Sequence, residues 1–181
     1  GNDILIVENL SKEGVFRNVS FTVNKGDKIA FICKNANVIT MIFKILMGED
    51  SADGGTFEWG STVTTGYLPE NNDAYFKDCG TSLVEWLSQY SDDKDQTFLR
   101  SWLGRMLFSG EEAKKKANCI SGGEKVRCML ARVMLSGANV LIFDEPTKGV
   151  DVGAKQEIFT LINDIAKAGN CVIYATCENS E

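Results

Sequence analysis

The stretch NVLIFDEP, from Asn139 to Pro146, decides the fold of this chain. Its continuous apolar run predicts a buried strand, which the proline prevents from continuing. The strand delivers two adjacent carboxylates, Asp144 and Glu145, at its C-terminal end, where ligands bind in an open α/β sheet. In phosphoryl-transfer sites the first carboxylate holds magnesium and the second polarises the attacking water. An acidic turn that merely closes a strand is the alternative interpretation.

A second stretch, ISGGEKVRCMLARVML from Ile120 to Leu135, predicts a long helix with a strong start. Ser121 followed by Glu124 forms a capping box, so Gly122 and Gly123 lie in the first turn of the helix. The free N–H groups and the dipole of a helix N-terminus favour an anion, and glycine lets a phosphate approach the backbone closely. A well-capped helix without a ligand is the alternative.

The composition is that of an ordinary globular domain. The chain has 181 residues, of which 44% are apolar and 24% charged, and its formal net charge is -6. This acidity argues against free-standing nucleic-acid binding, which needs a basic surface. There are six cysteines without a C-x-x-C pair and no histidine, which argues against a zinc site. We interpret the cysteines as reduced thiols of a cytoplasmic protein.

The order of the expected elements indicates one α/β domain with an inserted helical lobe. We expect an α/β core at 1–70 and 137–181 and a lobe at 71–136, with a core helix at about Val38–Met47. Continuously apolar strands suit a mostly parallel sheet covered on both faces, with an antiparallel portion near the N-terminus. The expected strands are ILIVE, VSFTV, KIAFI, GTFEWG, TVTTGYLP, NVLIF and CVIYAT, and the lobe helices are TSLVEWLSQY, QTFLRSWLGRMLF and GGEKVRCMLARVML.

As a pair, ISGGE and VLIFDEPT resemble the signature motif and the Walker B motif of ATP-binding-cassette (ABC) ATPases, which have a P-loop NTPase-like fold. The resemblance covers nearly the whole chain but involves two branches of the family. From about Gly26 to Pro146 the sequence is similar to ABC-F proteins, soluble cassettes associated with ribosomes. The flanks, VENLSKEGVFRNVSFTVNKGD and DEPTKGVDVGAKQEIFTLINDIAKAGNCVIYATCE, resemble the second cassette of monosaccharide-importer ATPases.

The resemblance implies ATP bound with Mg²⁺ on a P-loop. It also implies a second ABC cassette as partner, arranged head to tail so that each signature motif caps the γ-phosphate on the other subunit. It assigns the catalytic carboxylate to Glu145 and magnesium ligation to Thr40 and Asp144. The positions that it assigns to nucleotide contact are Lys34, Asn35, Ala36, Ile39, Thr40, Glu70, Ser121, Gly122, Gly123 and Asp151.

The phosphate-binding loop departs from the family pattern G-x-x-x-x-G-K-[ST], which falls on Cys33–Thr40. Cys33, Val38 and Ile39 stand where glycine, glycine and lysine are expected. Val38 resists the positive φ of a phosphate nest, and the missing lysine removes a charge-assisted bond worth about 1.5–3 kcal/mol. We therefore expect weak MgATP binding, and we predict that Val38, Ile39 and Met41 extend the apolar face of the following helix.

Two further positions differ from the family. Glu70 stands where a Q-loop glutamine is usual, and Cys177 stands near the switch position that is often histidine. Because the family continues with further core elements after the position of Glu181, we expect a truncated cassette.

Two classes of function stay open at this point. The first is an ABC-type ATPase whose dimer closure drives a change on the ribosome or, alternatively, a membrane permease for sugars. The second is a non-hydrolysing module with the cassette fold and a binding or structural role. The ISGGE and DEP motifs favour the first class, whereas the altered loop favours the second. Between the branches we favour the ABC-F-like one, because it covers the central block with the helical lobe.

Overall fold

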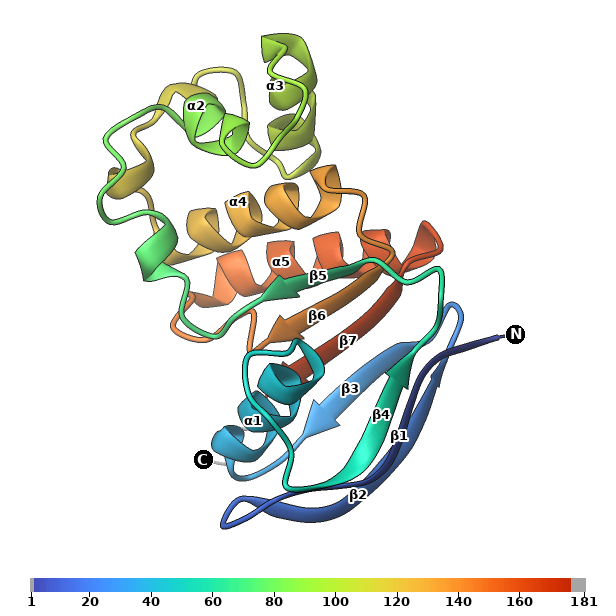
Figure 1. The fold of residues 1–181 in the computed structure, drawn as a ribbon. Helices are drawn as coiled ribbons and strands as arrows, with labels where there is room; N and C mark the ends of the chain where they lie inside the picture. Colours follow the sequence, from blue (N-terminus) through green and yellow to red (C-terminus); the bar gives the residue numbers. More distant parts are fainter. Residues whose placement is uncertain (1, 177–181) are drawn as a thin grey trace.

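The computed structural model describes residues 2–176, which form two β-sheets with helices packed around them (Figure 1). The strands are β1 (Asp3–Lys12), β2 (Phe16–Asn24), β3 (Lys28–Ile32), β4 (Gly54–Trp59), β5 (Thr65–Leu68), β6 (Val140–Asp144) and β7 (Cys171–Thr176). The α-helices are α1 (Ala36–Leu46), α2 (Leu83–Ser88), α3 (Gln96–Arg105), α4 (Gly122–Leu135) and α5 (Val152–Lys167). Short 3₁₀ turns are η1 (Asp73–Tyr75), η2 (Glu112–Lys114) and η3 (Ala117–Cys119). Among the described residues, no helix has both the length and the apolarity needed to cross a bilayer.

The strand β6 lies inside a parallel sheet of order β3-β7-β6-β5, between β7 and β5. All five of its residues are buried. Leu141 and Phe143 contact the cluster under α4 and α5, whereas Val140 and Ile142 contact the cluster around α1. Helices therefore cover both faces, as Figure 1 shows, which explains the continuously apolar sequence of the strand. The predicted α/β fold with a central, doubly covered strand is confirmed.

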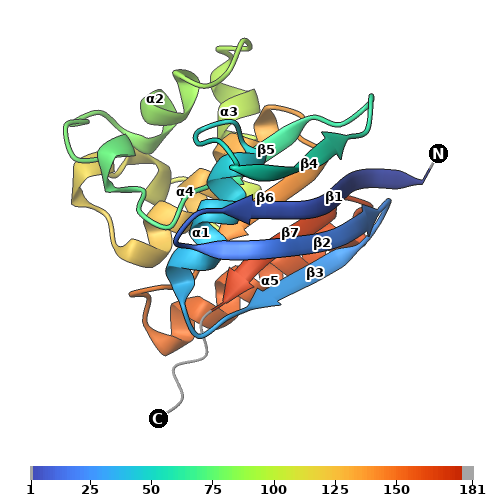
Figure 2. The same ribbon diagram turned by 60° about the horizontal axis from the view of Figure 1, so that its bottom comes forward.

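The second sheet is antiparallel, with the order β2-β1-β4, and it lies beyond α1 (Figure 2). The helix α1 buries Ile39, Ile42 and Phe43 in a cluster shared with both sheets. It begins at Ala36, two residues before the predicted start, because the side chain of Asn35 caps it. Val38 and Met41 pack partly buried against the same cluster, so the predicted extension of the apolar face is confirmed.

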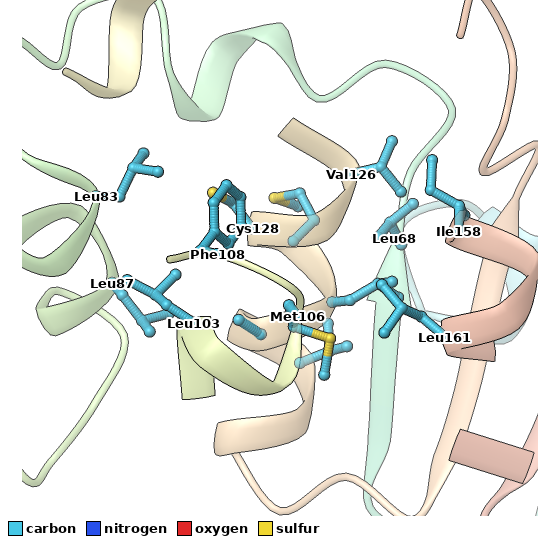
Figure 3. Packing of buried hydrophobic residues seen from close by; sticks show 14 of the residues in the cluster. Leu68, Leu83, Leu87, Leu103, Met106, Phe108, Val126, Cys128, Ile158 and Leu161 are labelled. Carbon is cyan, nitrogen blue, oxygen red and sulfur yellow. The ribbon is translucent and has the colours of Figure 1, made fainter. Parts of the chain in front are cut away.

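The helices α2 and α3 pack on the side of α4 that faces away from the parallel sheet (Figure 1). Figure 3 shows side chains from α2, α3, α4 and α5 meeting in one buried cluster, so this helical segment and the sheet share a core. The helix α3 ends at Arg105, before the predicted Phe108, because Leu107 adopts a left-handed φ of 71°. The N–H of Phe108 then donates to the carbonyl of Leu103 at 3.0 Å, which closes the helix in a Schellman motif.

Candidate functional site

The predicted metal ligands Thr40 and Asp144 meet at the C-terminal end of β6. Thr40 comes from the first turns of α1, and its hydroxyl Oγ1 donates a 2.7 Å hydrogen bond to Oδ2 of Asp144. The Asp144 residue is only 1% exposed. The bond links two segments that lie 104 residues apart in the sequence, and the parallel sheet brings them together at the edge where α/β proteins bind ligands.

Two further carboxylates lie beside Asp144. Glu145 follows it directly, and Glu70 follows β5, the neighbouring strand. One oxygen from each of the three side chains lies within 4.8 Å of the others. Glu145 has a left-handed φ of 47°, and its N–H donates to the carbonyl of Ala175 at 3.1 Å. Such a φ is unfavourable for a residue with a side chain, so the sheet holds this carboxylate in a constrained position.

The charges at this edge are only partly balanced. Lys148 forms an ion pair with Glu70, and its Nζ lies 3.8 Å from Oε2 of Glu145. Within residues 2–176, Oδ1 of Asp144 and Oε2 of Glu145 are buried without a hydrogen-bond partner. Burial raises the pKa of Asp144 to about 6, the charges of Glu70 and Glu145 add to this rise, and the hydrogen bond from Thr40 opposes it.

This donor set fits magnesium. Hard divalent cations prefer carboxylate and hydroxyl oxygens, and the site offers buried carboxylate oxygens that have no other partner. The resemblance predicted Thr40 and Asp144 as metal ligands. The sequence did not indicate that Glu70 lies beside Asp144 or that Lys148 forms an ion pair with Glu70. One feature of the sequence could have indicated this ion pairing: Lys148 follows Glu145 by three residues in an acidic turn.

The predicted phosphate-binding loop, Cys33–Thr40, forms the start of α1. Asn35 accepts a 3.1 Å hydrogen bond from the N–H of Asn37 on its side chain and another 3.1 Å bond from Val38 on its carbonyl. Every residue of this loop is described, and none has a positive φ. A backbone nest for a phosphate combines right- and left-handed residues, and this loop contains no left-handed residue.

The side chains of the loop point to different environments. Ile39, which occupies the position of the family's lysine, is 4% exposed and belongs to the buried cluster under the loop. Lys34 and Asn35 are exposed, and Ala36 is half-buried at the first position of the helix. Of the predicted contacts in this segment, Thr40 is the residue that the fold brings to the carboxylates.

The N-terminus of α4 has the predicted capping box. The hydroxyl of Ser121 accepts from the N–H of Glu124, and the carboxylate of Glu124 accepts from the N–H of Ser121, both at 3.2 Å. A Cβ on Gly123 would lie 2.9 Å from the Cβ of Ala154, so this glycine lets α4 pack against α5. A Cβ on Gly122 would meet nothing closer than 3.8 Å, so Gly122 leaves space for a ligand.

A cavity of about 320 Å³ joins this helix start to the carboxylates. Gly122, Lys125, Glu70 and Glu145 lie on its wall, and Lys125 is paired with Asp73 at 3.2 Å. The fold thus brings the predicted signature motif and the predicted Walker B motif of one chain to the same cavity.

The two remaining predicted contacts lie elsewhere. Asp151 caps α5, since its Oδ1 accepts a 3.0 Å hydrogen bond from the N–H of Ala154, so it has a local structural role. Cys177 lies outside the described residues.

Comparison with known proteins identifies the family. A family model described as "ABC transporter" matches residues 16–148. The chain belongs to the ABC transporter ATP-binding family. The ABC transporter ATP-binding protein YkpA of Bacillus subtilis, itself uncharacterized, is 54% identical over 169 residues, which are 91% of this chain and 31% of YkpA. The ribose import ATP-binding protein RbsA of Bacillus licheniformis is 28% identical over 207 residues, covering 100% of this chain and 41% of RbsA.

Solved ABC cassettes have the same fold. The dimeric post-hydrolysis structure of the cassette MJ0796, bound to ADP and Pi, superposes with a TM-score of 0.77 at 15% identity, covering 96% of this chain and 88% of that one. The ADP conformation of MJ1267 gives a TM-score of 0.77 at 18% identity, covering 97% of this chain and 81% of that one. The chain spans less than half the length of YkpA and RbsA, so it corresponds to one part of these relatives.

Proposed function

We propose that this ABC domain is ABC-F-like, works as one of two cassettes arranged head to tail, and binds MgATP weakly. The observation that carries the proposal is the contrast within one site. The 2.7 Å bond between Thr40 and Asp144, with Glu145 beside it, supports a magnesium site, whereas the loop of Cys33–Thr40 has no left-handed residue and carries Ile39 at the position of the family's lysine. The site would therefore offer ligands for the magnesium of MgATP but lack the backbone nest and the lysine that bind the phosphates in the family.

Each residue then has a role at the interface between two cassettes. Magnesium, when bound, would neutralise charge on the phosphates, with Thr40 and Asp144 holding it. Glu145 would orient and deprotonate the attacking water. Ser121 and Gly122 would face the partner cassette's phosphates from the N-terminus of α4, whose N–H groups and dipole favour an anion. Gly123 would serve this contact indirectly by letting α4 lie close to α5.

The remaining predicted contacts have smaller roles in this proposal. Glu70, at the Q-loop position, is paired with Lys148, which reduces its repulsion of phosphate. Asp151 would position the segment before α5. The exposed residues Lys34 and Asn35 and the half-buried Ala36 would line the weakened loop.

For the whole protein we favour the ribosome as partner and the cytoplasm as location. The sequence supports this through its ABC-F-like central block, which contains the helical lobe at 71–136 between core segments 1–70 and 137–181. The alternative partner is a membrane permease, because the chain is similar over its whole length to a ribose import ATP-binding protein. Co-sedimentation with ribosomes, compared with retention by a sugar permease in detergent, tests the two; binding to neither contradicts both.

A second candidate function follows from the buried position of Ile39. That side chain is packed in the core at 4% exposure and offers no charge to a phosphate, which suits a non-hydrolysing binding module. A calorimetric titration with MgATP separates the candidates. We expect binding much weaker than micromolar and negligible turnover. Micromolar affinity would contradict weak binding, and hydrolysis that Glu145→Gln abolishes would rule out the non-hydrolysing module.

A further inference from the structure

Three carboxylates of different origin converge at the C-terminal edge of the parallel sheet. Asp144 and Glu145 come from the end of β6, and Glu70 comes from the segment after β5. Each offers an oxygen within 4.8 Å of the other two, and Lys148 is the basic side chain that is paired with this cluster. Because the ion pairs of this cluster within residues 2–176 set one ammonium group against three carboxylates, its negative charge exceeds its positive charge there.

The hydrogen bonding of the cluster is also incomplete. Asp144 is 1% exposed, and while its Oδ2 accepts from Thr40, its Oδ1 has no hydrogen-bond partner within the described residues. Oε2 of Glu145, on a side chain only 9% exposed, accepts no hydrogen bond within residues 2–176 and lies 3.8 Å from Nζ of Lys148. A buried carboxylate oxygen without a donor is costly, and a cation that it could ligate would remove this cost.

We propose that Glu70, Asp144 and Glu145 bind a divalent cation directly in the absence of nucleotide, and that Lys148 occupies part of this site until the metal displaces it. The inference goes beyond the proposed function, in which magnesium accompanies ATP. Three carboxylates and the hydroxyl of Thr40 supply the hard oxygen ligands that Mg²⁺ and Mn²⁺ prefer.

Lys148 is suited to such an exchange. Its side chain is 58% exposed, so its ammonium group can return to water when it leaves Glu70. Glu70 is itself 28% exposed and lines the 320 Å³ cavity together with Glu145, which gives a hydrated ion a route to the cluster. The metal would then take over the charge balance that Lys148 supplies in its absence.

The test is a titration of the nucleotide-free chain with Mn²⁺, in which electron paramagnetic resonance measures the free ion. We expect saturable binding at one site and competition by Mg²⁺. Glu70→Gln keeps the shape of the side chain and removes its charge. Because even indirect partners of a metal change its affinity by about 10- to 100-fold, we expect this variant to bind Mn²⁺ about tenfold more weakly or worse.

Lys148→Met should act in the opposite direction, because it removes the competing cation and keeps a side chain of similar length. We expect Mn²⁺ affinity to rise by about three- to tenfold, the effect of one like charge removed near a partly exposed site. The matched control is Asp73→Asn, an acidic residue that lines the same cavity but pairs with Lys125; its affinity should stay within about twofold of the parent.

Thermal unfolding gives a second readout that does not depend on the resonance signal. Mn²⁺ should raise the melting temperature of the parent and of Lys148→Met, with little effect on Glu70→Gln. Absence of saturable binding, or equal affinities in the parent and Glu70→Gln, would overturn the site; weaker binding by Lys148→Met would overturn the displacement. All of these measurements are made without ATP, so a negative result would contradict the metal site without bearing on the proposed nucleotide binding.

Discussion

The end of β6 and the loop before α1 belong to the same candidate site, yet different interactions hold their residues in place. At the end of β6 the backbone is held between two neighbouring strands, and Asp144 is positioned by a bond to Thr40. In the loop the family's function depends on glycine conformations and one lysine, and here the equivalent side chains pack into the core. The difference teaches that packing and strand pairing fix side-chain positions at a sheet edge, whereas phosphate binding by a loop depends on the identity of a few residues.

Rebuilding the loop should have the largest effect on the difference in ligand binding between the two regions. The variant with Cys33→Gly, Ala36→Gly, Val38→Gly and Ile39→Lys combined should bind MgATP about 10- to 100-fold more tightly than the parent, because it restores both the nest and the charge-assisted bond. Calorimetric titration measures the gain. An unchanged affinity in a folded variant would show that the loop is not what limits binding.

Ile39→Lys alone is the control for that experiment. It should recover less affinity, because Val38 still opposes the nest. It should also lower the free energy of unfolding by about 2 kcal/mol or more, since Ile39 is 4% exposed in the core. Urea unfolding measures this cost.

The geometry at the end of β6 is tested by Thr40→Val. Valine has the shape of threonine but no hydroxyl, so Oδ2 of the buried Asp144 carboxylate loses its donor, and Oδ1 already lacks one within residues 2–176. We expect the free energy of unfolding at pH 7 to fall by about 1.5–3 kcal/mol, the worth of a hydrogen bond to a charged group. Thr40→Ser keeps the donor and should stay close to the parent. Equal losses in both variants would point to the methyl group instead.

The two glycines at the start of α4 separate a packing role, at Gly123, from a ligand-contact role, at Gly122. Gly123→Ala places a Cβ 2.9 Å from that of Ala154, so overpacking should lower the free energy of unfolding by about 1–3 kcal/mol. Gly122→Ala adds a methyl group at ordinary van der Waals distance, 3.8 Å from the carbonyl oxygen of Gly149, and should be neutral or slightly stabilising. Thermal unfolding of the pair gives the result, and the reverse order would contradict the close contact between α4 and α5.

The smallest effect concerns the capping box. Burial opposes ionisation of Glu124, but hydrogen bonds from Lys115 and Ser121 lower its pKa below the ordinary 4.5. A lowered pKa in the folded state stabilises the protein above pH 4.5, and this stability is lost as the pH falls through the folded value. Because Lys115 is 47% exposed, we expect less than about 1 kcal/mol. Unfolding from pH 7 to pH 3 should be less pH-dependent in Glu124→Gln, and an identical profile would exclude this contribution.

Much of the fold could be predicted because its signals are local. The apolar run of β6 indicated a doubly covered strand, and Ser121 with Glu124 indicated the start of α4. Helix ends were less predictable. The helix α1 begins earlier than predicted because Asn35 caps it. The helix α3 ends earlier because Leu107 adopts a left-handed conformation, for which leucine has no intrinsic preference. In the site, the motifs identified Asp144 and Thr40 through family resemblance, and the structure brought them together.

The sequence by itself determined which residues carry charge and which segments must be buried, since periodicity and capping depend on near neighbours. Only the tertiary structure decided which distant groups meet. Lys148 pairs with Glu70 across 78 positions, and Gly123 contacts Ala154 on another helix. These contacts depend on the order of strands in the sheet and on the packing of α4 against α5, and no local pattern encodes either. The physical reason is that burial and strand pairing act over the whole chain, whereas a motif records only its own segment.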